Sequence, residues 1–237
     1  MVPVATALLL FAGASTAACG STKSNSKGKA SASPSAKVPT AEELKKGLLA
    51  LSDMPTGYAA SPEESPGTGG SPQPEDTSSV TSTSAECNRL FNEFGEDSAS
   101  AEQAVVSTKF EKAATGPFVR HTVESYKDAA VLQKDIAQVR DAVTKCGGFT
   151  VKDEDGGARV KIANASFPKL GDETAAFKLE ATASRGGKKL TLGGYLIAGR
   201  VNNVVSTIIS FGLPTVDAGA TEQITRKAVD KVTPIAR

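Results

Sequence analysis

The stretch TAAFKLEATASRGGKKLTLGGYLIAGRVNNVVSTIISF, residues 174–211, decides the fold class of this chain. Its first part alternates apolar and polar residues, which predicts a half-buried β-strand. Arg-Gly-Gly-Lys at 185–188 is a hairpin turn signal, and a second strand is expected over 190–200. Asn-Asn at 202–203 then turns the chain into a nearly continuous apolar strand over 204–211, which we expect at the centre of a sheet. Three strands joined by tight turns predict an antiparallel sheet.

Two amphipathic helices are expected to cover this sheet. Over Asp128–Cys146, apolar residues recur at spacings of four and three, which predicts a helix of about 18 residues. A final helix is expected from about Ala218 to Val232, with its apolar residues turned inward. Two further strands, over 104–112 and 118–126, precede the first of these helices. This order of elements predicts an α+β fold, an antiparallel β-sheet flanked by helices.

The domain is expected to begin at a capping box, Thr40-Ala41-Glu42-Glu43, which predicts the start of a helix. Leu44, Leu48 and Leu51 would then share one face of that helix. Ala59 to Ser84 is rich in Pro, Ser, Thr, Gly and Glu, and a stretch of this composition cannot bury much apolar surface. We therefore expect a disordered loop at about 59–84 inside a single α+β domain that spans residues 40–237.

The sequence LLLFAGASTAACG, residues 8–20, is an apolar run followed by small residues and one cysteine. This pattern is typical of a secretion signal, and it resembles the lipobox of bacterial lipoproteins, in which the cysteine is lipidated and becomes the first residue. We expect a signal peptide over 1–18 and lipidation at Cys19, with plain secretion as the alternative. Thr16 replaces the usual Leu. In addition, no basic residue precedes the apolar run, and a start upstream of Met1 would explain this second departure. The run is too short to span a bilayer.

Residues 19–39 are mainly Ser, Lys, Ala and Gly, which predicts a flexible tether between the lipid and the domain. The expected location is therefore the outer face of the bacterial cytoplasmic membrane, with the domain extracellular and the membrane as a partner through the anchor. The formal net charge of +1 disfavours a nucleic-acid-binding protein, which would carry a basic stripe.

Two of the three cysteines, Cys87 and Cys146, remain after the lipobox is assigned. Cys87 falls in a short helix that Ser84 can cap, and Cys146 falls on the apolar face of the long helix at its last turn. In an oxidising compartment such a pair predicts a disulfide, which would stabilise the fold by roughly 4 kcal/mol in the chain-entropy model. Two free buried thiols are the alternative.

No residues of the chain form a recognisable catalytic or metal-binding pattern. His121, the only histidine, shares a strand face with Val119 and Val123, which favours a hydrogen-bonded core residue over a metal ligand or catalytic base. Asp153-Glu154-Asp155 lacks the alternating ligands and the closing Glu of a calcium loop. We expect no enzyme activity, no catalytic residues, no metal and no cofactor, and the sequence leaves the ligand-binding residues unknown.

Four short motifs carry a resemblance to a known family. They are Leu49-x-Leu51-Ser52-Asp53-Met54-Pro55-x-Gly57-Tyr58, the cysteine at Cys87, Cys146-Gly147, and Leu170-Gly171-Asp172-Glu173-Thr174. In this order the chain resembles actinobacterial sensor-domain lipoproteins, similar to the extracellular sensor domain of mycobacterial transmembrane serine/threonine kinases. The resemblance implies an antiparallel sheet flanked by helices, a cleft for an unidentified ligand and no enzyme activity. Such kinase sensors often carry a second disulfide, for which this chain has no cysteines.

Three functions are compatible with these features. The first is a non-catalytic lipoprotein of the cell surface that binds or senses a small-molecule, cell-wall or protein ligand. The second is a carrier of lipid or glycolipid between membrane and cell wall, in which Phe110, Phe118, Phe177 and Phe211 line a cavity instead of filling the core. The third is a wall hydrolase, which would need carboxylates converging in one cleft.

Overall fold

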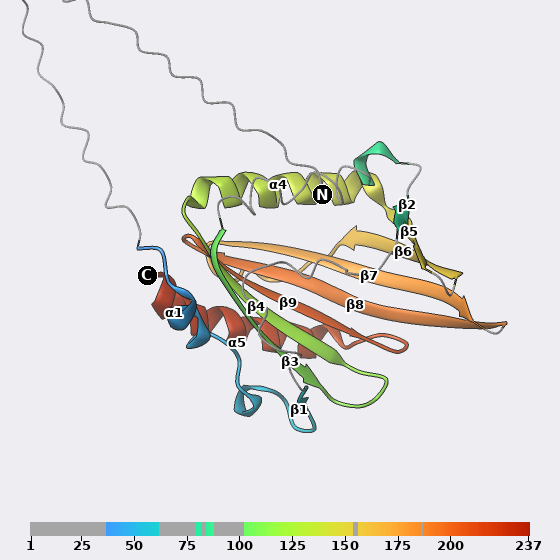
Figure 1. Cartoon of the computed structure of the whole chain (residues 1–237), viewed down its shortest axis with the longest axis horizontal. Coiled ribbons are helices and arrows are strands. Elements are labelled where there is room, and N and C mark those ends of the chain that lie inside the picture. Colours follow the sequence, from blue (N-terminus) through green and yellow to red (C-terminus); the bar gives the residue numbers. More distant parts are fainter. Residues whose placement is uncertain (1–36, 62–78, 82–83, 88–101, 154–155, 186) are drawn as a thin grey trace, which may run out of the picture. The chain divides into compact units, whose positions relative to one another are not determined.

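The strands of the chain pair into one antiparallel sheet with helices on both of its faces (Figure 1). The computed structural model describes residues 37–61, 79–81, 84–87, 102–153, 156–185 and 187–237. The elements within these residues, in chain order, are α1 (Ala41–Lys45), a 3-10 turn (Leu51–Asp53), β1 (Ala59–Ala60), β2 (Ser79–Thr81), β3 (Glu102–Glu111), β4 (Phe118–Tyr126), α4 (Ala129–Cys146), β5 (Gly148–Asp153), β6 (Gly156–Asn164), β7 (Glu173–Arg185), β8 (Lys188–Val201), β9 (Val204–Gly212) and α5 (Ala218–Ala236). The predicted α+β class is confirmed. None of the described helices is long and apolar enough to cross a membrane.

The strand order explains why the long helix is needed. Across the described residues the sheet runs β1-β3-β4-β9-β8-β7-β6-β5-β2. From β4, the third strand in this order, the chain crosses through α4 to β5 near the other edge of the sheet. It then returns strand by strand through β6, β7 and β8 until β9 pairs with β4 (Figure 1). The apolar strand predicted at 204–211 is therefore central, as expected, because β4 and β8 flank it on both edges.

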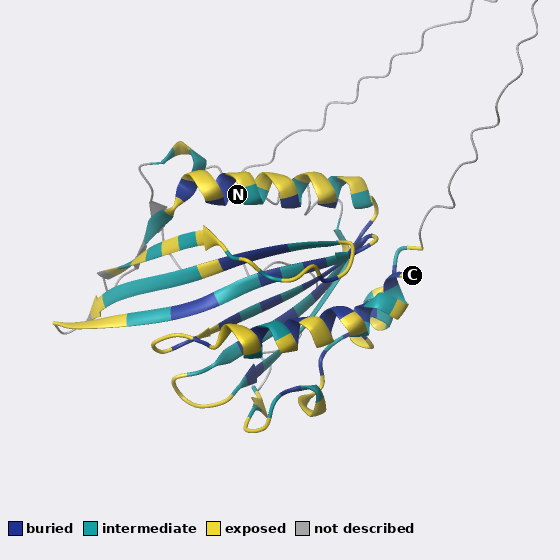
Figure 2. Cartoon of the chain, turned by 180° about the vertical axis from the view of Figure 1, so that it is seen from behind, coloured by how far each residue is buried: buried dark blue, intermediate teal, exposed yellow. Residues whose placement is uncertain are grey.

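The two long helices cover opposite faces of the sheet. Val143 of α4 packs in one cluster with Phe177 of β7, whereas Val232 of α5 packs in another with Val204 of β9. Successive residues of a strand point to opposite faces, so both faces need their own apolar set. Figure 2 shows each helix with a buried stripe toward the sheet and an exposed stripe away from it. Each face therefore has its own hydrophobic core.

The first helix is shorter than predicted. The capping box at Thr40 is formed, with the backbone N–H of Glu43 donating to Thr40 Oγ1 and Thr40 N–H donating to Glu43. The helix nevertheless ends at Lys45, and Leu51 lies 48% exposed in the separate 3-10 turn. The expectation that Leu51 shares a face of this helix with Leu44 and Leu48 was wrong. The chain turns at Gly47, where a Cβ would lie 2.9 Å from Cδ1 of Ile235 in α5, so the absence of a side chain permits this close packing.

Two short edge strands lie within the stretch expected to be a loop. β1 pairs with β3, and β2 pairs with β5 at the opposite edge of the sheet. Strands of two or three residues have no periodicity to read, so only their pairing defines them. Residues 62–78 and 82–83 of the predicted loop lie outside the described residues, as do the predicted signal peptide, Cys19 and the predicted tether up to residue 36.

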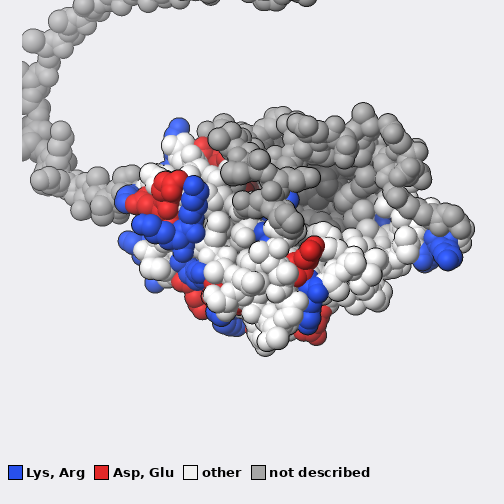
Figure 3. Space-filling view, turned by 60° about the horizontal axis from the view of Figure 1, so that its bottom comes forward, with Lys and Arg blue, Asp and Glu red and all other residues white. Residues whose placement is uncertain are grey.

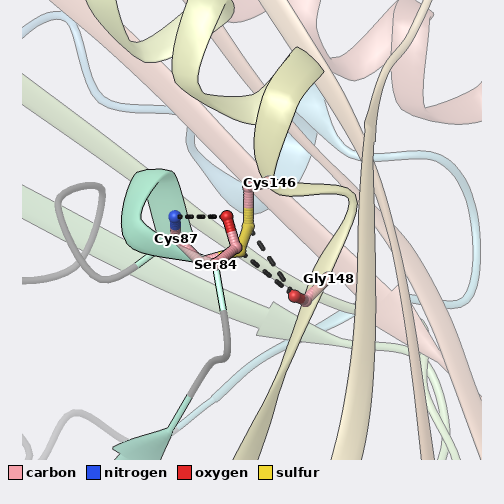
Figure 4. Close-up of a disulfide and its surroundings, with 4 residues drawn as sticks. All are labelled: Ser84, Cys87, Cys146 and Gly148. Carbon is pink, nitrogen blue, oxygen red and sulfur yellow. Dashed lines mark hydrogen bonds between the residues drawn. A yellow bond between two sulfur atoms is a disulfide. The ribbon is translucent and has the colours of Figure 1, made fainter.

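Cys87 and Cys146 form the predicted disulfide (Figure 4). Ser84 caps the turn before it, since its Oγ accepts a hydrogen bond from the Cys87 N–H at 3.4 Å. The carbonyl oxygen of Gly148 lies 3.1 Å from Cys87 Sγ and 3.8 Å from Cys146 Sγ. Bonded sulfurs carry no proton, so these are packing contacts. The bridge joins the chain before β3 to the junction of α4 and β5.

Candidate ligand pocket

A small pocket opens where the β3–β4 turn and the β9–α5 connection meet the segment that follows the 3-10 turn. Its volume is about 130 Å³. The side chains that decide its chemistry are those of Tyr58, Lys112, Pro117, Ser210, Asp217 and Ala220. We refer to it as the Ser210 pocket. It lies on the side of the sheet that α5 covers.

Close backbone packing forms one wall of the Ser210 pocket. Gly116 has a φ of +91°, and a Cβ there would lie 2.9 Å from the Cα of Gly212, at the end of β9. The Leu213 N–H donates to the carbonyl oxygen of Thr115 at 2.9 Å. Only glycine permits both this conformation and this approach at position 116. The β3–β4 turn is therefore held against the connection that leads into α5.

The first turn of α5 forms the opposite wall. Asp217 caps the helix, with its Oδ1 accepting a hydrogen bond from the Ala220 N–H at 2.6 Å. Thr221 Oγ1 donates to the carbonyl oxygen of Asp217 at 2.8 Å. Short acidic side chains favour this position because they satisfy an N–H that the helix leaves unpaired. The cap thus fixes a carboxylate at the edge of the pocket.

Ser210 lies at the base of the pocket and is 2% exposed. Its hydroxyl has no hydrogen-bond partner among the described residues, whereas the neighbouring Ser206 hydroxyl bonds His121 at 3.0 Å. Ser210 Oγ is not among the buried side-chain atoms that lack a partner in the described residues, so the hydroxyl is accessible from the pocket that Ser210 lines. The hydroxyl is therefore available to a molecule that enters the pocket.

Two opposite charges line the pocket without pairing. The Lys112 ammonium lies over the Tyr58 ring, 6.0 Å from its centroid, and burial raises the pKa of the Tyr58 phenol above its ordinary value, so the phenol is neutral. Within the described part of the chain neither Lys112 nor Asp217 makes an ion pair. In parts of the surface cations and carboxylates lie side by side (Figure 3). Lys231, for example, pairs with Asp53 at 2.6 Å. The pocket therefore brings together two charges of opposite sign that have no ion pair within the described residues.

His121 is a core residue, as the sequence indicated. Its Nδ1 accepts a hydrogen bond from the Leu49 N–H at 3.1 Å, so the ring proton must lie on Nε2 and be donated to Ser206 Oγ at 3.0 Å. A histidine that activates a serine needs the reverse arrangement, with Nε2 accepting. Both side chains are also fully buried. This serine–histidine pair therefore cannot act as a nucleophile and base.

The four phenylalanines of the carrier hypothesis do not line one cavity. Phe110 is 3% exposed in the core under α5, and Phe177 is 4% exposed in the core under α4, on the other face of the sheet. Phe118 and Phe211 stack on each other with ring centroids 5.3 Å apart. Two of the four thus fill separate cores, and the others form a pair of their own.

Most residues of the pocket were not identified from the sequence. Tyr58 belongs to the first family-like motif, but Lys112, Ser210 and Asp217 lie far apart in the chain and in no motif. The helix cap at Asp217 and the turn at Gly116-Pro117 can be recognised from the sequence. Neither signal indicates which distant segments contact each other in the fold. No three His, Cys, Asp or Glu of the described residues are grouped so that they could hold a metal ion.

The architecture has a solved counterpart. The fold is similar to that of the extracellular domain of PknH from Mycobacterium tuberculosis. The crystal structure of that domain matches with a TM-score of 0.56 and 18% sequence identity, over 84% of this chain and 98% of the other. No family model and no curated protein sequence matches the chain. The likeness confirms the resemblance to mycobacterial kinase sensor domains at the level of the fold.

Proposed function

We propose that this protein is a non-catalytic, lipid-anchored module at the outer face of a bacterial cytoplasmic membrane, and that it senses a small ligand in the Ser210 pocket. The observation that carries the proposal is that the Ser210 hydroxyl, the Lys112 ammonium and the Asp217 carboxylate line one pocket, and that within the described residues the hydroxyl has no hydrogen-bond partner and neither charge has an ion pair. The lipobox-like pattern that ends at Cys19 supports the location. The likeness to an extracellular domain of a kinase supports a role in sensing.

The dimensions of the pocket favour a small ligand over a lipid. About 130 Å³ is below the range of roughly 300–1,000 Å³ typical of sites for drug-sized molecules. An acyl chain would need a longer apolar cavity, and the phenylalanines that could have formed one are used in packing. We therefore favour binding and sensing over lipid transport.

Thermal unfolding with a matched pair of variants tests this function. Ala220→Leu fills the pocket from the first turn of α5, whereas Ala218→Leu makes the same change at an exposed position of that turn outside the pocket. The full chain, solubilised in detergent micelles, is heated with and without a concentrated extract of bacterial culture medium. A ligand at 100 times its Kd stabilises by about 2.7 kcal/mol, which raises the Tm by roughly 5–10 °C.

The expected result is a rise in Tm for the wild type and for Ala218→Leu, and none for Ala220→Leu. Equal rises in all three proteins would mean that the ligand binds outside the Ser210 pocket. The absence of any rise in the wild type would contradict the binding function itself.

A further inference from the structure

We infer that the Ser210 pocket takes a small zwitterion, an amino acid or a dipeptide, whose carboxylate meets Lys112 and whose ammonium group meets Asp217. This inference rests on the proposed binding function and names the chemical class of the ligand. It follows from the charge, the size and the lining of the pocket.

The charges of the pocket favour a ligand that carries both signs. Lys112 and Asp217 line the same pocket, but no ion pair joins them. A simple anion would be attracted by Lys112 and repelled by Asp217. A simple cation would be attracted by Asp217 and repelled by Lys112. Like charges brought together at a binding site cost several kcal/mol and act against the wrong partner. A molecule with separated opposite charges satisfies both residues.

Each charge is held in place by a contact that leaves it available. Asp217 Oδ1 accepts a hydrogen bond from the Ala220 N–H, and its second carboxylate oxygen has no partner among the described residues. The Lys112 ammonium lies over the face of the Tyr58 ring. The Lys112 side chain also passes close to Gly57, where a Cβ would lie 3.2 Å from Lys112 Cε. The ammonium can therefore donate to a carboxylate without first breaking an ion pair.

The size and walls of the pocket set an upper limit on the ligand. The volume of about 130 Å³ is well below the roughly 300–1,000 Å³ of sites for drug-sized molecules. Pro55, Pro117 and Val216 give it apolar walls, which suit a small aliphatic side chain. The Ser210 hydroxyl offers one neutral donor and acceptor at the base.

Isothermal titration of the full chain in detergent micelles with defined probes tests the inference. The probes are L-alanine and L-alanyl-L-alanine, followed by the N-acetyl and the amide forms of whichever binds more tightly. The N-acetyl form lacks the ammonium group, and the amide lacks the carboxylate. We expect the zwitterion to bind the wild type, and each capped form to bind at least about tenfold more weakly.

Two charge-removing variants locate the contacts. Asp217→Asn retains the helix cap, because asparagine caps as well as aspartate, but it removes the charge. We expect this variant to bind the zwitterion about tenfold more weakly and to lose its preference over the N-acetyl form. Lys112→Met should instead lose the preference over the amide. Ala220→Leu should bind none of the probes, and Ala218→Leu should bind as the wild type does.

Two results would overturn the inference. One is wild-type affinity that is equal for the zwitterion and both capped forms. The other is no binding of either zwitterion at about 1 mM, a concentration that half-fills a site with a Kd of about 1 mM. If medium extract still stabilises the wild type but not Ala220→Leu, only the ligand class is wrong and the binding function stands. If the extract also has no effect, both proposals fail.

Discussion

At the scale of single residues, burial determines the charge of His121. The ring lies fully buried beneath α5, and burial, assisted by the positive charge of Lys231, lowers its pKa to about 3, against a smaller opposing effect of Asp53. The ordinary pKa of an unfolded histidine is about 6.5. The folded protein therefore holds His121 neutral at pH values where the unfolded chain protonates it.

This difference predicts a loss of stability in mild acid. As the pH falls below about 6.5, the unfolded state binds a proton that the folded state excludes, so the free energy of unfolding falls by on the order of 1 kcal/mol per pH unit. Urea unfolding at pH 7 and pH 5 measures it. Burial raises the pKa of Glu124, which contributes with the opposite sign, so the histidine effect is isolated by comparison with His121→Gln. An equal pH dependence in that variant would contradict the prediction.

At the scale of elements, the disulfide holds the chain before β3 against the end of α4. Its two cysteines are 59 residues apart, so it closes a long loop in the unfolded chain. Replacing both cysteines by serine should lower the free energy of unfolding by about 4 kcal/mol, measured by urea denaturation. Alkylation of denatured, unreduced protein followed by mass spectrometry is the check. Labelling of both Cys87 and Cys146 in the wild type would show that the bridge is not formed.

A second link ties α4 to the sheet through one carboxylate. Glu173 of β7 receives Arg140 Nη1 of α4 at 3.0 Å and Arg200 Nε of β8 at 3.3 Å. The Arg200 and Glu173 side chains are 11% and 15% exposed, so the pair is screened less than a surface pair. Removing the carboxylate leaves a largely buried guanidinium without its counterion.

We expect Glu173→Gln to lower the free energy of unfolding by about 2 kcal/mol in urea denaturation. Glu180→Gln is the matched control on the same strand, because Glu180 faces Lys161 at 3.8 Å with both side chains exposed. Its effect should stay within about 0.5 kcal/mol. Similar decreases in the free energy of unfolding of the two variants would mean that burial of the Glu173–Arg200 pair does not increase its contribution to stability.

At the scale of the whole molecule, the proposed location depends on one residue outside the described structure. Cys19→Ala removes the thiol that would carry the lipid, and the protein should then be released into the medium in place of sedimenting with membranes. Immunoblotting of the membrane and medium fractions measures the distribution. Cys87→Ser, which leaves the lipobox intact, is the control and should stay with the membrane. Continued membrane association of Cys19→Ala would contradict the anchor.

The fold class could be predicted because its signals are local. Strand alternation, tight turns and the 3.6-residue period of α4 each depend on residues close in sequence, and the central position of β9 follows from its apolar composition. The features that were predicted wrongly or not predicted depend instead on contacts between residues far apart in the sequence. After α1 the chain packs at Gly47 against Ile235 of α5, which is distant in sequence, and β1 and β2 exist only through pairing with distant strands.

The sequence by itself determined the α+β class, the helices at 128–146 and near the C-terminus, the pairing of Cys87 with Cys146 and the core role of His121. Only the tertiary structure decided which side chains meet in the Ser210 pocket. Tyr58, Lys112, Ser210 and Asp217 come from four separate segments, and the contact between the turn at Gly116 and the end of β9 brings them together. Local periodicity reports which face of an element is buried, but it carries no information on which distant segments share a surface.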